Sequence, residues 1–191
     1  GDRLIMVDAD GEIIDGDELL YIIARARIHA GDDIKGVVGT LMSNMGLELA
    51  IKEMELEFER ANVGDRYVLE RLNQKGWMLG GESSGHIICL DRTTTGDGIV
   101  SALQVLAYLA ETGKTLSEVR SGMKKMPMHM INVPLNGQAN PLVSEQVKSA
   151  LQKAEQQLNG RGRVLLRASG TEPLIRVMVE GEEETMVNAL T

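Results

Sequence analysis

The sequence predicts a layered α/β domain with a mostly parallel sheet, followed by a small α+β domain. Three observations support this fold class. Strand-like and helix-like segments alternate over residues 15–121, which is typical of α/β layers. Gly122 and Pro127 then interrupt the pattern, and beyond them one amphipathic helix lies among three strand-like runs.

The first elements begin with two short strands, 4–8 and 13–14, joined by an Asp-Gly turn in which Gly11 can adopt positive φ. Residues 15–31 have apolar side chains at helical spacing, with Asp17 as a candidate N-cap and Gly31 as the stop. The pattern continues with a buried strand (37–42), a helix opened by Ser43 or Asn44 (43–54), a strand (58–63) and a helix (65–76).

The later elements follow from the same periodicities. We expect two strands around a glycine-rich turn (77–82 and 86–90), a long helix (96–113), a strand (128–133), an amphipathic helix (143–160), two strands (163–168 and 174–181) and the start of a last helix (182–190). The loops of the α/β part should gather at one edge of its sheet, where ligands of such folds usually bind.

Composition excludes several classes of protein. The 191 residues carry a net charge of −8 and only 3% aromatic residues, so a nucleic-acid partner is not expected. No apolar run is long enough to span a bilayer, and the first residues lack the pattern of a signal peptide, so none is expected. The single cysteine, Cys89, lies in an apolar run and fits a reducing, cytoplasmic location. The chain starts with Gly1, which suggests a piece of a longer protein.

The stretch RASGTEP, which joins the last two strands, could bind an anion. Ser169, Gly170 and Thr171 can direct backbone N–H groups and two hydroxyls to one point. Arg167 precedes them and Arg176 lies on the returning strand; each guanidinium could grip a phosphate bidentately. The alternative is a plain hairpin turn with solvated arginines.

The loop GGESSGH offers Glu82, Ser84 and His86 between two strands. A carboxylate, a hydroxyl and an imidazole on one loop suit recognition of a polyhydroxylated ligand. Two alternatives remain: Ser84 and His86 as nucleophile and base, or an ordinary polar turn.

Weaker candidates carry acidic side chains. Asp2, beside Arg3, could end an acidic metal-binding loop, although one carboxylate does not make a Mg²⁺ site. Asp65, beside Arg66, is more often a plain N-cap than a ligand group. Asp15 and Asp17 also suggest a metal, with capping as the better interpretation.

Five motifs in one order resemble the C-terminal part of an α-D-phosphohexomutase: GDR, VGDRYV, GESSGH, TTTGDGIVSALQVL and RASGTEPLIRVMVEG. The resemblance covers nearly the whole chain. It implies that residues 1–14 end the second, metal-loop domain of a four-domain enzyme. Residues 15–121 would form the third, sugar-binding domain, and residues 122–191 the fourth, phosphate-binding domain, which the chain does not finish.

The resemblance also implies roles for particular residues. Asp2 would ligate Mg²⁺ and Arg3 would point toward the reacting groups. The sugar would be bound by Glu82, Ser84 and His86, with Asp65 and Arg66 as weaker candidates. The non-transferred phosphate would be bound by Arg167, Ser169, Gly170, Thr171 and Arg176.

The family reaction would interconvert glucosamine 6-phosphate and glucosamine 1-phosphate through a phosphoserine and glucosamine 1,6-bisphosphate, supplying precursors for the cell wall. No T-A-S-H-N-P-like serine loop is present, and the first two aspartates of the metal loop are missing. This chain alone is therefore expected to be inactive, and its partners would be a phosphosugar and the N-terminal domains of the same protein. Alternatives are a phosphomannomutase or phosphoglucomutase, or a non-catalytic phosphosugar-binding module.

Overall fold

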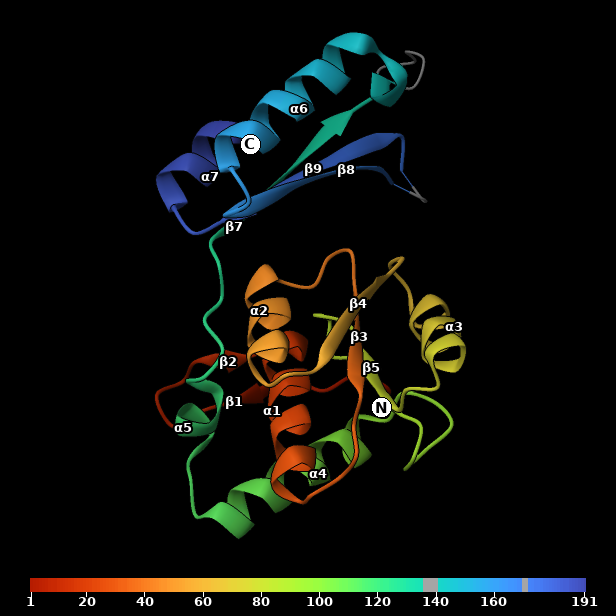
Figure 1. Cartoon of the computed structure of the whole chain (residues 1–191), viewed down its shortest axis with the longest axis vertical. Helices are drawn as coiled ribbons and strands as arrows, with labels where there is room; N and C mark the ends of the chain where they lie inside the picture. Colours follow the sequence, from red (N-terminus) through yellow and green to blue (C-terminus); the bar gives the residue numbers. More distant parts are fainter. Residues whose placement is uncertain (136–140, 170–171) are drawn as a thin grey trace. The chain divides into compact units, whose positions relative to one another are not determined.

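The computed structural model describes residues 1–135, 141–169 and 172–191 and divides the chain into two compact units (Figure 1). Unit 1 is Gly1–Lys125 and unit 2 is Met126–Thr191. The division falls between Lys125 and Met126, whereas the sequence placed it before Gly122. Residues 1–14 belong to unit 1, so their assignment to a preceding domain stays a prediction.

Unit 1 is built around a four-stranded sheet of order β4-β3-β5-β6. Its elements are β1 (Met6–Val7), β2 (Ile13–Ile14), α1 (Gly16–His29), β3 (Gly36–Thr40), α2 (Met45–Glu53), β4 (Glu57–Ala61), α3 (Asp65–Lys75), β5 (Leu79–Gly81), β6 (Ile87–Cys89), α4 (Gly98–Thr112) and α5 (Leu116–Arg120). β3 runs parallel to β4 and β5, and β6 is antiparallel to β5. The predicted mostly parallel sheet is confirmed; α5 was not expected.

The sheet is covered on both faces because successive residues of a strand point to opposite sides. Val37 packs in one apolar cluster with α1, α2 and α4, whereas the next residue, Val38, packs in a second cluster with Val68 and Leu72 of α3. All five residues of β3 are buried. The result is an α/β/α sandwich with helices on both sides (Figure 1).

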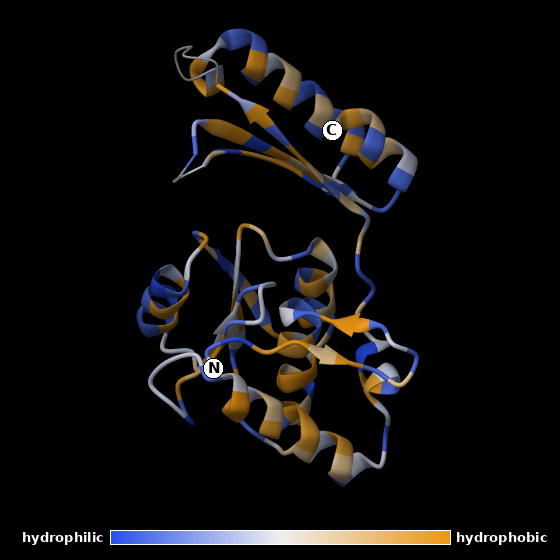
Figure 2. Cartoon of the chain, turned by 180° about the vertical axis from the view of Figure 1, so that it is seen from behind, coloured by the Kyte–Doolittle hydropathy of each residue, from blue (hydrophilic) through white to orange (hydrophobic). Residues whose placement is uncertain are grey.

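The hairpin of β1 and β2 has apolar residues on both faces, and Figure 2 shows both strands as hydrophobic. Met6 and Ile14 pair across the strands and contact the core. Their neighbours Val7 and Ile13 also pair but are 58% and 62% exposed. The hairpin thus contributes one face to the core and leaves the other in contact with solvent.

The start of α1 differs from the sequence prediction. Asp15, not Asp17, is the N-cap; its side chain accepts the N–H groups of Asp17 and Glu18, and Glu18 completes a capping box. Asp17 is buried instead, and its Oδ2 accepts the N–H of Asn44 at 2.8 Å. Burial raises the pKa of Asp17 to about 7, although the Asn44 N–H opposes the shift.

Unit 2 is a three-stranded antiparallel sheet of order β7-β9-β8 with two helices on one face. Its elements are β7 (Met128–Pro134), a 3₁₀ turn (Pro141–Val143), α6 (Glu145–Leu158), β8 (Gly162–Ala168), β9 (Leu174–Gly181) and α7 (Glu184–Leu190). Its core joins Leu158 of α6, Val179 of β9 and Val187 of α7. The predicted α+β unit is confirmed. Within the described ranges, no helix is long and apolar enough to cross a membrane.

The buried Asp17 predicts a pH dependence of stability. Its folded pKa of about 7 lies above the unfolded value of 3.8, so between these values the folded chain binds more protons than the unfolded chain. The free energy of unfolding should therefore fall as pH rises from about 4 to about 7 and level off above. Asp17→Asn should reduce this fall and stabilise the chain by about 1–3 kcal/mol at pH 8. Urea unfolding at several pH values measures the difference.

The exposed Asp32→Asn variant is the control, since it removes one negative charge without removing a buried carboxyl group. An Asp17→Asn profile that ran parallel to the Asp32→Asn profile would contradict this account of Asp17.

Candidate functional site

The predicted sugar loop, residues 82–86, is held against the first turn of α1 by backbone contacts. Gly16 N donates to Ser83 O at 3.1 Å, and Leu4 N donates to Gly85 O at 3.0 Å. A Cβ on Gly16 would lie 2.0 Å from Glu82 O, and a Cβ on Gly85 would lie 2.1 Å from Leu4 O. Only glycine permits such an approach. The backbone of the loop is therefore fixed by these contacts, and Ser84 is its exposed side chain.

The carboxylate of Glu82 is oriented by the loop that follows β4. Its Oε1 accepts the N–H of Gly64 at 2.9 Å. Gly64 has φ +128°, a conformation that side chains with a Cβ rarely adopt, and it is the N-cap of α3. Ser84, two residues beyond Glu82, is exposed. The carboxyl ends of β4 and β5 thus meet at Glu82, at the edge where a ligand was expected.

His86 brings three of the predicted motifs together. Its Nδ1 lies 3.4 Å from Asp2 Oδ2, and its Nε2 lies 4.0 Å from Asp65 Oδ2, which is too long for a hydrogen bond. The His86 side chain is 7% exposed, whereas both aspartates are largely exposed. Asp2's own backbone N–H and the contact with His86 hold the pKa of Asp2 below its usual value.

The TTTGDG segment forms the wall behind His86. A Cβ on Gly96 would lie 2.3 Å from His86 Nε2 and within 2.7 Å of two ring carbons. Gly98 N donates to Gly1 O at 2.8 Å, so the same segment also holds the chain before β1. The imidazole ring therefore packs directly on the backbone of Gly96, where a larger residue would not fit.

The nucleophile and base interpretation of Ser84 and His86 gains no support. No hydrogen bond joins these two residues in the described structure; the nearest acceptor to His86 Nδ1 belongs to Asp2. Arg66, a weaker candidate, donates from Nη2 to Tyr67 Oη at 2.7 Å, and its guanidinium lies over the same ring. Arg3 is exposed.

The surroundings of Asp2 differ from those of a usual magnesium site. Its carboxylate is 65% exposed and its neighbouring ligand type is an imidazole, whereas Mg²⁺ prefers several oxygens. Among the residues with a described position, no group of three His, Cys, Asp or Glu side chains could hold a metal ion. These residues alone do not make a magnesium site, and Asp2 can supply at most one of its ligands.

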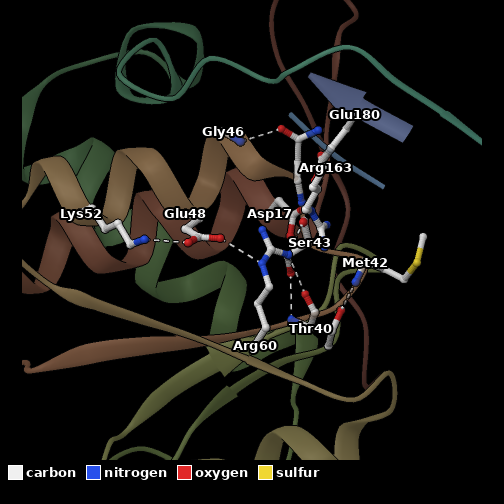
Figure 3. A network of polar contacts seen from close by, with 11 residues as sticks. Asp17, Thr40, Met42, Ser43, Gly46, Glu48, Lys52, Arg60, Arg163 and Glu180 are labelled. Carbon is white, nitrogen blue, oxygen red and sulfur yellow. Dashed lines mark hydrogen bonds and ion pairs between the residues drawn. The ribbon is translucent and has the colours of Figure 1, made fainter. Parts of the chain in front are cut away.

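Arg60, at the end of β4, holds the turn that follows β3, a contact that the sequence did not reveal (Figure 3). From the end of β4, its Nη1 donates to Thr40 O at 2.9 Å and to Ser43 O at 2.7 Å, and its Nε donates to Glu48 Oε2 at 3.0 Å. These bonds fix the turn that follows β3. Since an arginine in a polar strand usually faces solvent, the sequence carried no signal for this role.

In unit 2 the two predicted arginines are directly opposite each other. Arg167 of β8 pairs with Arg176 of β9, and Asn132 of β7 is the next residue in the same row. Like charges at opposite positions of an antiparallel pair are destabilising. Both side chains are partly buried, and neither Nε has a hydrogen-bond partner in the described structure. Arg176 Nη2 lies 3.7 Å from Glu172 Oε2.

The turn between these strands is closed by local hydrogen bonds. Ser169 N donates to Leu174 O at 2.9 Å, and Glu172 N donates to Ser169 Oγ at 3.3 Å. Gly170 and Thr171 lie outside the described residues, so their predicted role stays a prediction. Arg167, Ser169 and Arg176 thus lie at one end of the sheet.

One pocket in unit 1 lies away from these motifs. A pocket of about 340 Å³ opens near the amino-terminal ends of β3 and β5 and is lined by Lys35, Trp77 and Arg92 among others. None of the predicted site residues lines it. The candidate site described here is defined by contacts between loops.

Comparison with protein families gives two adjoining matches. Residues 15–126 match the family model described as phosphoglucomutase/phosphomannomutase, alpha/beta/alpha domain III. Residues 130–190 match the phosphoglucomutase/phosphomannomutase C-terminal domain.

Curated relatives and solved structures are similar over the whole chain. The chain is 59% identical over 190 residues to a phosphoglucosamine mutase of Hahella chejuensis and 61% identical over 187 residues to one of Aeromonas hydrophila. It spans 43% and 42% of their lengths, and 100% and 98% of the chain is covered.

Two solved structures share the fold. A crystal structure of N-acetylglucosamine-phosphate mutase in its product complex matches with a TM-score of 0.78 at 20% identity, covering 99% of this chain and 45% of that one. An Aspergillus fumigatus N-acetylphosphoglucosamine mutase with GlcNAc-6P and magnesium also matches at 0.78, with 22% identity and coverage of 99% and 48%.

The contact of His86 with Gly96 predicts the effect of a single methyl group. Gly96→Ala should displace the imidazole, because its Cβ would lie 2.3 Å from Nε2, and should cost about 1–3 kcal/mol of stability. NMR spectra of the His86 ring protons and thermal unfolding measure both effects. Thr94→Ala, at an exposed position in the same segment, is the control. Unchanged His86 ring signals in Gly96→Ala would show that the ring does not pack there.

Proposed function

Because the chain belongs to the phosphoglucomutase/phosphomannomutase family, we propose that it is the substrate-recognition part of a phosphosugar mutase. In this proposal unit 2 binds the phosphate that is not transferred, and the 82–86 loop of unit 1 binds sugar hydroxyls. The whole protein would interconvert glucosamine 6-phosphate and glucosamine 1-phosphate, and so supply cell-wall precursors.

The facing arginines of unit 2 carry this proposal. Arg167 and Arg176 occupy opposite positions of β8 and β9, where their charges repel, and each retains an Nε without a hydrogen-bond partner in the described structure. A dianionic phosphate removes the repulsion and accepts bidentate hydrogen bonds from planar guanidiniums. Such a pair is costly without an anion and favourable with one.

The 82–86 loop supports sugar recognition by the number and fixed direction of its polar groups. Glu82 is held through Oε1 by Gly64, which leaves its other oxygen for a hydroxyl donor. Ser84 is exposed on the same loop and can donate or accept. The His86 ring is buried, with Nδ1 3.4 Å from Asp2 Oδ2 and the ring packed on Gly96, so its orientation would be set before a ligand arrives. Preorganised groups lose little entropy on binding.

The transfer step would need parts of the longer protein. The chain spans less than half the length of the relatives reported above, and these 191 residues contain no T-A-S-H-N-P-like serine loop. We propose that a phosphoserine in the remaining part exchanges its phosphoryl group with the substrate through glucosamine 1,6-bisphosphate. Asp2 would give one ligand to Mg²⁺, which would neutralise charge on the transferring group, and Arg3 would support it. The isolated chain would bind and not turn over.

The choice of glucosamine 6-phosphate rests on the names of the most similar relatives reported above. Glu82, Ser84 and the two arginines would contact groups that glucose and mannose phosphates also carry. A phosphoglucomutase or phosphomannomutase activity is therefore the alternative that a substrate comparison must decide.

Phosphosugar binding can be measured on the chain as it stands. Glucosamine 6-phosphate should shift the NMR amide signals of residues 82–86 and of the β8 and β9 residues beside Arg167 and Arg176. Arg167→Ala should weaken binding about 10- to 150-fold, the range that one charge-assisted hydrogen bond of 1.5–3 kcal/mol gives. Arg71→Ala, which removes a guanidinium from α3, is the control and should leave the affinity unchanged.

Inorganic phosphate tests the phosphate site apart from the sugar loop, since it should shift only the NMR signals of unit 2. If glucosamine 6-phosphate bound with equal affinity to wild type and Arg167→Ala, the phosphate assignment would be wrong. A signal change in unit 2 without any change at residues 82–86 would reject the sugar loop.

Turnover can be tested in a chimera in which this chain replaces the corresponding part of the Hahella chejuensis relative, to which it is 59% identical. Glu82→Gln should lower kcat/KM about 10- to 150-fold, because a hydrogen bond to a charged group contributes about 1.5–3 kcal/mol. Glu70→Gln on α3 is the matched control. Comparing glucosamine, glucose and mannose 6-phosphates identifies the substrate; a preference for either hexose phosphate would favour the alternative activity.

A further inference from the structure

We propose that the pocket at the amino-terminal edge of the unit 1 sheet is a second ligand site, which binds a small zwitterion of the α-amino acid type with an apolar side chain. Arg27 and Arg92 bind the carboxylate of this ligand, and Asp32 binds its ammonium group. Ile34 and Met78 lie against its apolar side chain. The pocket contains none of the residues assigned to the phosphosugar, so this inference does not depend on the proposed function.

The pocket lies at the edge of the sheet opposite the 82–86 loop because of how the strands run. β3 and β5 are parallel, and both begin at this edge. β6 is antiparallel to β5 and ends here, so Asp91 and Arg92 follow it into the pocket wall. Arg27 reaches the same place from the last turn of α1. The volume of about 340 Å³ is within the range of roughly 300–1,000 Å³ that is usual for small-molecule sites.

Arg27 presents a buried guanidinium to this pocket, and its hydrogen bonds are incomplete. Its side chain is 5% exposed, and its Nη2 donates to Asp91 Oδ1 at 2.7 Å and to Gln104 Oε1 at 3.3 Å. Within the described residues, Nη1 donates to no acceptor. Buried polar groups are usually hydrogen-bonded, and a guanidinium offers five N–H donors. This wall of the pocket therefore favours a further acceptor.

One carboxylate is shared by two arginines at the same wall. Asp91 Oδ1 lies 2.7 Å from Arg27 Nη2, and Asp91 Oδ2 lies 3.1 Å from Arg92 Nε. Both oxygens of Asp91 are thus engaged, and two positive charges face one negative charge. The Arg92 side chain is 54% exposed, so it can direct its remaining donors to a ligand. A ligand carboxylate supplies the second negative charge and accepts hydrogen bonds from the planar guanidiniums.

Asp32 provides a negative charge close to these arginines. Its N–H donates to Arg27 O at 2.9 Å. Arg27, Asp32 and Arg92 also line a second hollow of about 150 Å³, so the three residues lie close together. Among the described residues the Asp32 carboxylate has no ion pair, whereas the carboxylate of its neighbour Asp33 lies 2.5 Å from Lys35 Nζ. Asp32 is therefore available to a ligand cation.

The balance of charge favours a zwitterion over a simple anion. The charged side chains that line the pocket are equal in number, three of each sign: Arg27, Lys35, Arg92, Asp32, Asp33 and Asp91. A ligand with only an anionic group would be repelled by Asp32, and a ligand with only a cationic group would be repelled by Arg92. A ligand with one group of each sign can meet an opposite charge at both positions.

The apolar side of the pocket is ordered by contacts within unit 1. Trp77 packs on Gly36, where a Cβ would lie 2.5 Å from Trp77 Cη2. Lys75 Nζ lies 4.9 Å from the centroid of the Trp77 ring and 2.7 Å from Glu59 Oε1. Next in the chain, Met78 is a large apolar side chain that is 46% exposed. An apolar group that covers Met78 removes this surface from water, which favours binding.

Fluorescence of Trp77, the only tryptophan in the sequence, reports directly on this pocket. The test compares L-phenylalanine with phenethylamine, which lacks the carboxylate, and with 3-phenylpropionate, which lacks the ammonium group. L-Phenylalanine should cause a saturable change. Each analogue should bind at least about fivefold more weakly, the factor that an ion pair of about 1 kcal/mol gives. No saturation with L-phenylalanine, or equal affinities for the three compounds, would overturn the proposal.

Two substitutions at exposed positions assign the charged groups of the ligand. Arg92→Gln should weaken L-phenylalanine and 3-phenylpropionate at least about fivefold and leave phenethylamine unchanged. Asp32→Asn should weaken L-phenylalanine and phenethylamine by a similar factor and leave 3-phenylpropionate unchanged. Arg71→Gln on α3 and Asp10→Asn before β2 lie outside the pocket and are the matched controls. A variant pair that weakened all three compounds alike would contradict the assignment of these charges.

NMR amide signals distinguish this site from the proposed phosphosugar site. L-Phenylalanine should shift the signals of Ile34, Gly76 and Met78, and shifts confined to other residues would overturn the proposal. Glucosamine 6-phosphate carries an amine and a phosphate but no apolar side chain, so it should not displace L-phenylalanine; displacement would show that the pocket is not a separate site. If glucosamine 6-phosphate bound nowhere, the proposed function would be wrong while the Trp77 titration would still decide this inference.

Discussion

The contact between the backbone at Gly16 and the backbone at Glu82 is the constraint on which the rest of unit 1 depends. A Cβ at Gly16 would lie 2.0 Å from Glu82 O and 2.5 Å from Gly85 N, so no other residue fits without moving the loop. This contact places the carboxyl end of β5 on the start of α1. The helix turn is held from the other side by Lys125. Gly16 therefore joins the 82–86 loop to the capped first turn of α1.

Most of the fold could be predicted because hydrophobic periodicity reflects local geometry. The alternation of strands and helices gave the sandwich of unit 1, and two strand patterns around RASGTEP gave the hairpin of unit 2. Residue type alone did not identify the N-cap of α1, because two neighbouring aspartates could serve. Asp15 and Asp17 are both good caps by type, and only packing against Asn44 selects Asp17 for burial. The five-residue α5 was too short for a periodic signal.

The candidate site was predictable only within each loop. Arg167 and Arg176 flank one turn, so their proximity follows from the hairpin that the sequence predicts. Asp2 and Asp65 both lie near His86, although Asp2 is 84 positions away from it in the sequence. No local sequence pattern specifies either contact. Asp65 follows β4 and His86 precedes the antiparallel β6, so the sheet brings both residues to the edge where β4 and β5 end, but it does not fix the directions of their side chains.

The facing arginines of β8 and β9 would make the free energy of unfolding of unit 2 depend on the concentration of an anionic ligand. A ligand that binds only the folded state stabilises it by mass action, by about 2.7 kcal/mol at one hundred times its dissociation constant. In the proposed complex, a phosphosugar between Arg167 and Arg176 would replace this repulsion by attraction, and local separation of β8 from β9 would become rarer.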